Sequence, residues 1–146
     1  MKHLSKAGAV AFVLWGLLHV AGGGMILSAL SNGPGEGFAI YQNHEGTYTP
    51  LAGAILAYFA FLIVSIGAAA ALVGVFLNWR NSGWGLAINT TMIGVTDIGL
   101  VIFLLSPGFV TVGEASIGIV LFVVGATFCT TAWLSERAVK VIASAV

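Results

Sequence analysis

A chain of 146 residues that is 59% hydrophobic and only 7% charged is too apolar for a soluble globular domain, in which about a quarter of residues carry charge. The five basic and five acidic side chains cancel, and the basic ones are scattered, which excludes the clustered positive surface of a nucleic-acid-binding protein. The composition therefore predicts an integral membrane protein, and the length leaves room for one membrane domain over 1–146.

Four apolar runs follow one another along the chain, approximately at 7–30, 51–77, 85–106 and 116–135. Each is long enough to cross a hydrocarbon core of about 30 Å as a helix. The later connections are short, so neighbouring helices must be antiparallel. The sequence thus predicts an all-α, up-down bundle of four transmembrane helices.

The connection at 31–50, between the first two runs, is the one long loop. Loops of this length are uncommon unless they are functional or disordered. Its aromatic residues indicate that it folds back over the outer mouth of the bundle, and it supplies the outer candidates Tyr41, His44 and Glu45. Two adjacent ligands do not make a metal site, so no metal is predicted there.

Basic residues are confined to one side of this predicted topology. They precede the first run, follow the second or follow the fourth, namely Lys2, Lys6, Arg80, Arg137 and Lys140. The two connections on the opposite side contain neither Lys nor Arg. Because Lys and Arg are enriched in cytoplasmic loops, the N- and C-termini and the 78–84 turn are predicted to be cytoplasmic. The expected location is a bacterial inner membrane, which the chain crosses several times.

Small residues are concentrated in the second run. Gly67 and Ala71, and likewise Ala70 and Gly74, are four residues apart and share a helix face. Close backbone approach at small residues is a main source of packing energy between helices in lipid. This face predicts the tightest interface of the protein, either within the bundle or between protomers.

Two ionisable side chains fall inside the predicted spans. At about 1.5 Å of rise per residue, His19 and Asp97 both lie roughly 18 Å along outward-running helices, near the middle of the membrane. An ionisable group at that depth is costly, faces the bundle interior and normally has a partner. The sequence therefore predicts a contact between the His19 imidazole and the Asp97 carboxyl.

Further polar or aromatic side chains complete the candidate site, because they recur at intervals of three or four residues on the same helices or on the fourth run. They are Trp15, Asn89, Thr96, Thr127 and Thr131. The alternative for the threonines is a bond to a carbonyl of their own helix, and for the pair a lock that fixes helix register.

Three functions are compatible with this constellation. The first is a non-enzymatic bundle, an oligomeric or accessory subunit of a membrane complex that contacts lipids and holds a lipid, quinone or pigment near His19 and Asp97. The second is a small proton-coupled transporter or channel in which Asp97 titrates. The third, least favoured, is a membrane enzyme that uses the pair as acid and base, and no catalytic residue is assigned.

Overall fold

A computed structural model of the chain describes residues 2–39, 41 and 48–144. These residues form helices and their connections, without strands, and include four long apolar helices that could each cross a membrane. They are α1 (Lys2–Leu30), α3 (Pro50–Phe76), α4 (Gly83–Leu100) and α5 (Val112–Ser144). The prediction of a helical chain with four helices long and apolar enough to cross a membrane is confirmed.

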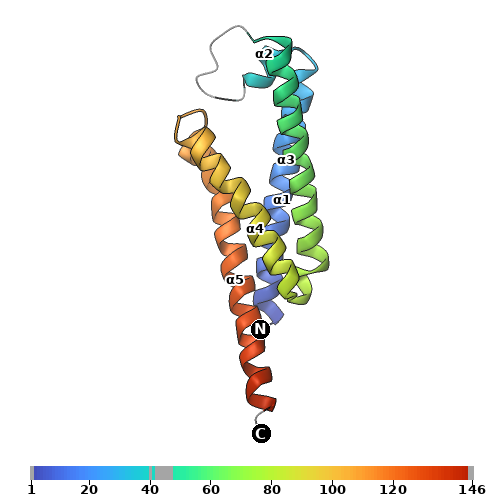
Figure 1. The fold of residues 1–146 in the computed structure, drawn as a ribbon, viewed down its shortest axis with the longest axis vertical. Helices are drawn as coiled ribbons and strands as arrows, with labels where there is room; N and C mark the ends of the chain where they lie inside the picture. Colours follow the sequence, from blue (N-terminus) through green and yellow to red (C-terminus); the bar gives the residue numbers. More distant parts are fainter. Residues whose placement is uncertain (1, 40, 42–47, 145–146) are drawn as a thin grey trace.

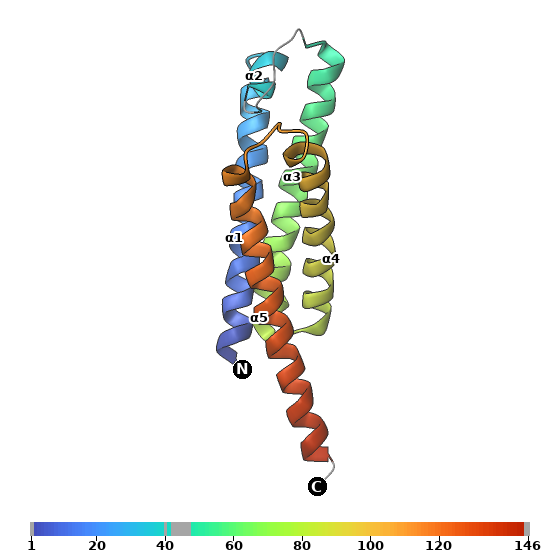
Figure 2. The same cartoon turned by 90° about the vertical axis from the view of Figure 1, so that its left-hand side faces the viewer.

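The long helices pack in the order in which they follow one another. α1 packs along α3 and α5, and α4 contacts the same two helices from the other side. Figures 1 and 2 show that α1 begins, and α5 ends, at the end of the molecule that also holds the turn between α3 and α4. This end is called the basic end below, because Lys6, Arg80 and Arg137 lie there. The short helix α2 (Pro34–Phe38) marks the opposite, α2 end.

Side-chain caps explain where the helices begin. Thr49 and Ser82 precede α3 and α4, and each hydroxyl accepts a hydrogen bond from a backbone N–H three residues further on. At α5, Thr111 and Glu114 form a reciprocal capping box: the Glu114 N–H donates to Thr111 Oγ1 at 3.2 Å, and the Thr111 N–H donates to Glu114 Oε2 at 2.7 Å. The helix therefore begins at Val112, and the predicted start at 116 is too late.

The first and fourth predicted spans are also shorter than the helices that contain them. α1 already begins at Lys2, and α5 continues past 135 to Ser144. Hydropathy marks only the part of a helix that can lie in hydrocarbon, and no Gly or Pro interrupts either extension. Figure 2 shows the resulting projection of α5 beyond the other helices at the basic end.

The predicted loop at 31–50 contains the helix α2, which Pro34 begins with its fixed backbone angle. Phe38 and Tyr41 pack against the buried cluster of Ile26, Leu56 and Ala60, which joins α1 to α3. Burial raises the pKa of the Tyr41 phenol above its ordinary value. The outer candidates His44 and Glu45 lie outside the described residues.

The small-residue face of α3 packs against α1. A Cβ added at Gly67 would lie 2.6 Å from the Gly16 carbonyl oxygen, and one added at Gly74 would lie 2.9 Å from Val13 Cγ2. A Cβ at Gly16 would in turn collide with the Gly67 carbonyl oxygen. Of the two interfaces predicted for these residues, the structure therefore places the tight one inside the bundle.

Candidate functional site

Asp97 is the only acidic residue among the buried side chains of the described chain. It lies near the end of α4 with 5% of its surface exposed, and its Oδ1 accepts a hydrogen bond of 3.2 Å from the indole Nε1–H of Trp15 on α1. Its second oxygen, Oδ2, is buried and has no hydrogen-bond partner among the described residues. The carboxyl group thus has one donor where its two oxygens have room for several.

Trp15 connects this carboxyl to His19. The indole is fully buried and stacks on the His19 ring at a centroid distance of 3.6 Å and an interplanar angle of 21°. His19 Nδ1 lies 2.8 Å from the Trp15 carbonyl oxygen. Because a carbonyl only accepts, Nδ1 carries the proton and Nε2 of the neutral ring remains available as an acceptor.

The predicted contact between His19 and Asp97 is wrong. Neither a hydrogen bond nor an ion pair joins the two side chains; Trp15 takes the place of His19 at Oδ1. The physical reason is local: His19 lies one helical turn beyond Trp15, and its ring folds back onto the carbonyl of that turn. The longer indole reaches across to α4. Trp15, predicted only as a neighbour of His19, is the residue that contacts both.

Gly118 of α5 closes the site from the third side. A Cβ at this buried glycine would lie 3.5 Å from His19 Cε1 and 3.7 Å from Trp15 Nε1, which is ordinary van der Waals contact. The edges of both rings therefore face the α5 backbone. Three helices meet here: α1 supplies the rings, α4 the carboxyl and α5 the backbone surface.

Towards the basic end, the site is sealed by an apolar cluster. Phe12, Ala70, Ile93 and Cys129 pack together with Trp15, and Ile93, one turn before Asp97 on α4, is fully buried. On this face of α4, the apolar Ile93 therefore separates the Asp97 carboxyl from the polar side chain of Asn89.

Asn89 lies beyond this cluster and belongs to a separate polar group. Its Nδ2 donates to the Ala70 carbonyl oxygen at 3.2 Å and to Asn78 Oδ1 at 2.8 Å. Asn78 is buried in the short 3-10 helix Asn78–Arg80, which lies within the turn predicted at 78–84. The two asparagines fix α4 to the end of α3 and do not reach Asp97.

The threonine candidates are not brought to Asp97 either. Thr96 Oγ1 donates to the Met92 carbonyl oxygen of its own helix at 2.9 Å. Thr131 makes the same kind of bond to the Thr127 carbonyl oxygen at 2.8 Å, and both Thr127 and Thr131 are exposed. These hydroxyls follow the alternative in which threonine is satisfied by its own backbone.

On its other side, Asp97 is followed by a π-helical segment, Val101–Leu105, in which no residue is buried. The Val101 N–H is shared between the Asp97 and Ile98 carbonyl oxygens where the two helix types meet. Figure 1 shows α4 and α5 diverging from α1 and α3 towards the α2 end. π-helical turns are rare and frequently occur at functional sites. The apolar sequence of this segment gives no sign of it.

In the part of the chain that the structure describes, no group of three His, Cys, Asp or Glu residues is placed to hold a metal ion. No family model matches the chain, and neither a curated protein nor a solved structure shows significant similarity to it. The fold and the site define the chain as a multi-pass helical membrane protein with a buried carboxyl held by a tryptophan.

Proposed function

We propose that this protein is a non-enzymatic membrane bundle that binds one lipophilic molecule with a ring hydroxyl, of the quinol type, beside Asp97. The observation that carries this proposal is the buried Oδ2 atom without a partner. A carboxyl at mid-membrane depth costs several kcal/mol unless it is neutral or paired, and a donated hydroxyl would relieve that cost (about 1.5–3 kcal/mol for a bond to a charged group).

The surroundings favour an aromatic ligand over the other lipophilic candidates. The His19 ring stacks on the buried Trp15 indole and is itself partly exposed, so it offers a flat aromatic face, and its Nε2 offers a second acceptor. A lipid without a hydrogen-bond donor would leave Asp97 Oδ2 unpaired. A pigment held through its metal by His19 would do the same. A ring with a hydroxyl group satisfies the carboxyl and uses the stacking surface together.

Access to the carboxyl distinguishes binding from the proposed alternatives. A proton-coupled transporter needs a polar path on both sides of Asp97, and the buried Ile93 interrupts the row of polar residues towards Asn89. An acid–base enzyme needs two cooperating groups, and His19 is bonded to a backbone carbonyl instead of to Asp97. The segment beyond Asp97, 101–105, contains no fully buried residue, which favours entry from the lipid or the α2 end.

The test uses the fluorescence of Trp15 as the reporter. Of the four tryptophans, Trp79, Trp84 and Trp133 are replaced by phenylalanine, and the protein in lipid nanodiscs is titrated with a decyl-substituted benzoquinol. We expect a saturable change in fluorescence. Asp97→Leu should weaken the affinity about tenfold or more, because the ligand loses a hydrogen bond to a charged or polarised group.

Thr96→Val is the matched control. Thr96 is the neighbour of Asp97 in sequence, but its hydroxyl bonds within its own helix, so this variant should keep the parent affinity. Equal affinity of the parent and Asp97→Leu, or a fluorescence change that never saturates, would contradict the proposal.

We also propose that the basic end faces the cytoplasm of a bacterial inner membrane. The described basic side chains support this orientation, since Lys6, Arg80, Arg137 and Lys140 all belong to segments at that end. A green fluorescent protein fused to the C-terminus should fluoresce, because this reporter does not mature when it is exported unfolded. A fusion that is fully produced but not fluorescent would place the C-terminus outside the cytoplasm and contradict the proposed orientation.

Self-association, or membership of a larger membrane complex, is a separate proposal with less to support it. Its sequence basis was the small-residue face of α3, and Gly16 of α1 occupies that face within one chain. The mass of the protein in lipid nanodiscs tests it: a multiple of the chain mass would support association.

A further inference from the structure

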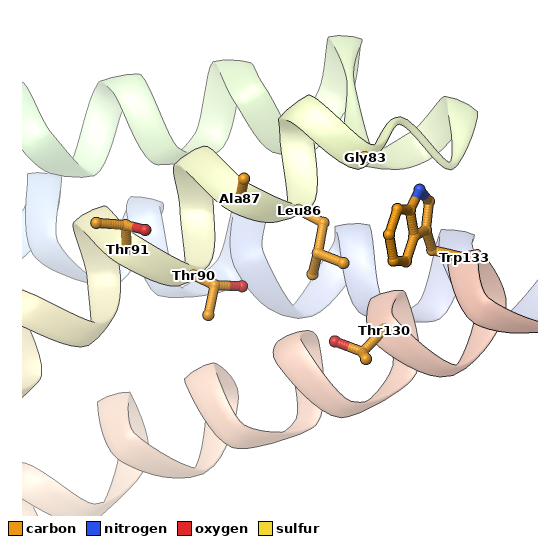
Figure 3. A pocket seen from close by; sticks show the side chains of 7 residues that line it. All are labelled: Gly83, Leu86, Ala87, Thr90, Thr91, Thr130 and Trp133. Atoms are coloured by element: carbon orange, nitrogen blue, oxygen red, sulfur yellow. The ribbon is translucent and has the colours of Figure 1, made fainter.

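A feature that the proposed function does not use lies between α4 and α5 at the basic end, on the other side of the apolar cluster from Asp97. It is a groove of about 340 Å³ whose walls include Gly83, Leu86, Ala87, Thr90, Thr130 and Trp133. Figure 3 shows the two helices on either side of it, with the Trp133 ring at one end and Thr90 and Thr130 further along. None of these residues contributes to the site described above.

The groove contains hydroxyl groups that the protein does not use. Thr90 Oγ1 is buried and has no hydrogen-bond partner among the described residues. In Figure 3 the hydroxyls of Thr90 and Thr130 point into the space between the helices from opposite walls. Threonine in a membrane helix ordinarily bonds to its own backbone, as Thr96 and Thr131 do here. Thr90 departs from that pattern inside a groove.

The Arg137 side chain lies next to Trp133, one of the residues that line the groove. The Arg137 guanidinium lies over the Trp133 ring, 4.4 Å from its centroid, because helix side chains lean towards the N-terminus of their helix. The neighbouring carboxylate, Glu136, is paired with Lys140 at 2.7 Å and with the Asn81 amide at 2.6 Å. Arg137 has no ion pair among the described residues, so its charge is available to an anion.

We propose that this groove binds one anionic phospholipid of the leaflet at the basic end. Its phosphate pairs with Arg137 beside Trp133, and its ester groups accept hydrogen bonds from Thr90 and Thr130. Thr130 lies one helical turn deeper than Trp133, about 4.5 Å at 1.5 Å per residue, in the same order as phosphate and esters in a phospholipid. The first part of an acyl chain then lies against Leu86 and Ala87.

Charge complementarity selects an anionic lipid over a neutral one or a second copy of the chain. The segments at this end carry Lys6, Arg80, Arg137 and Lys140 against the single carboxylate Glu136 in the described part of the chain. A second copy would bring the same positive charge to the groove, whereas an anionic lipid neutralises it. Arginine is also suited to bind a phosphate through two parallel hydrogen bonds.

The test is native mass spectrometry of the detergent-purified protein with phosphatidylglycerol or phosphatidylcholine that carry the same acyl chains. We expect one saturable site that binds phosphatidylglycerol about fivefold more tightly, as one basic residue near an anionic surface contributes on that order. Arg137→Gln should bring phosphatidylglycerol down to the affinity of phosphatidylcholine. Arg80→Gln, an exposed arginine at the same end but outside the groove, should not.

Two further variants separate the groove from non-specific lipid contact. Ala87→Phe fills the groove and should abolish the site, whereas Ala68→Phe on the exposed face of α3 should keep it. Thr90→Val with Thr130→Val should weaken both lipids, while Thr131→Val should weaken neither. Equal affinity for the two lipids, retention of the site in Ala87→Phe, or a changed oligomeric mass in place of lost lipid would overturn the proposal.

Discussion

Gly16→Val is expected to force α1 away from α3 and to destabilise the protein by about 3 kcal/mol or more, because the added atoms collide with backbone and not with a movable side chain. The nearest obstacles to a Cβ at this position are the Gly67 carbonyl oxygen and the Ala71 backbone nitrogen. Neither can move without a shift of the whole of α3. The structure predicts a larger effect here than at any exposed glycine.

Gly22→Val is the matched control on the same helix. A Cβ at Gly22 meets nothing within 4 Å, so valine there should change the free energy of unfolding by no more than about 0.5 kcal/mol. Unfolding in increasing mole fractions of sodium dodecyl sulfate, followed by circular dichroism, measures both variants. Equal stability of Gly16→Val and Gly22→Val would contradict the close packing of α1 on α3.

Trp15→Phe should cost the protein the hydrogen bond to Asp97 and leave both carboxyl oxygens buried without a donor, a penalty of about 1–3 kcal/mol in addition to the lost ring volume. In an Asp97→Leu background there is no carboxyl left to satisfy. There the same substitution should cost only the ring volume. The two costs therefore differ by the energy of the interaction, expected at about 0.5–3 kcal/mol.

The measurement is a double-mutant cycle over the parent, Trp15→Phe, Asp97→Leu and the combined variant, with free energies of unfolding from the same detergent titration. Asp97→Leu on its own can be neutral or stabilising, since it replaces a half-satisfied carboxyl by an apolar side chain. Additive costs across the cycle would show that Trp15 and Asp97 do not interact, whatever the size of each single effect.

The architecture could be predicted because it depends on long-range averages of the sequence. Four apolar runs of sufficient length lead to four helices, and small residues spaced four apart lead to a close helix contact. The same averages could not decide whether Gly67 and Gly74 face another protomer or α1. That choice depends on which face α1 presents: Gly16 and Gly23 pack against α3, whereas a Cβ at Gly22 or Gly24 meets nothing within 4 Å.

The contacts of the site could not be predicted from the sequence. The heights of His19 and Asp97 follow from helical rise, which is nearly constant. Which side chain reaches the carboxyl depends on rotamers, and the His19 ring has a competing acceptor in the Trp15 carbonyl oxygen. The same limit applies to the threonines, since each can bond to its own helix, and only the local packing decides that Thr90 does not.

The most direct test of the account is the indole N–H signal of Trp15 in a nitrogen-15 correlation spectrum of the tryptophan-labelled protein in lipid nanodiscs. The signal is assigned by its loss in Trp15→Phe. A hydrogen bond to Asp97 in the dry interior predicts a proton shifted downfield, slow to exchange with water, and displaced in Asp97→Leu while the signals of Trp79, Trp84 and Trp133 stay in place. A Trp15 signal that exchanges rapidly and is indifferent to Asp97→Leu would contradict the account.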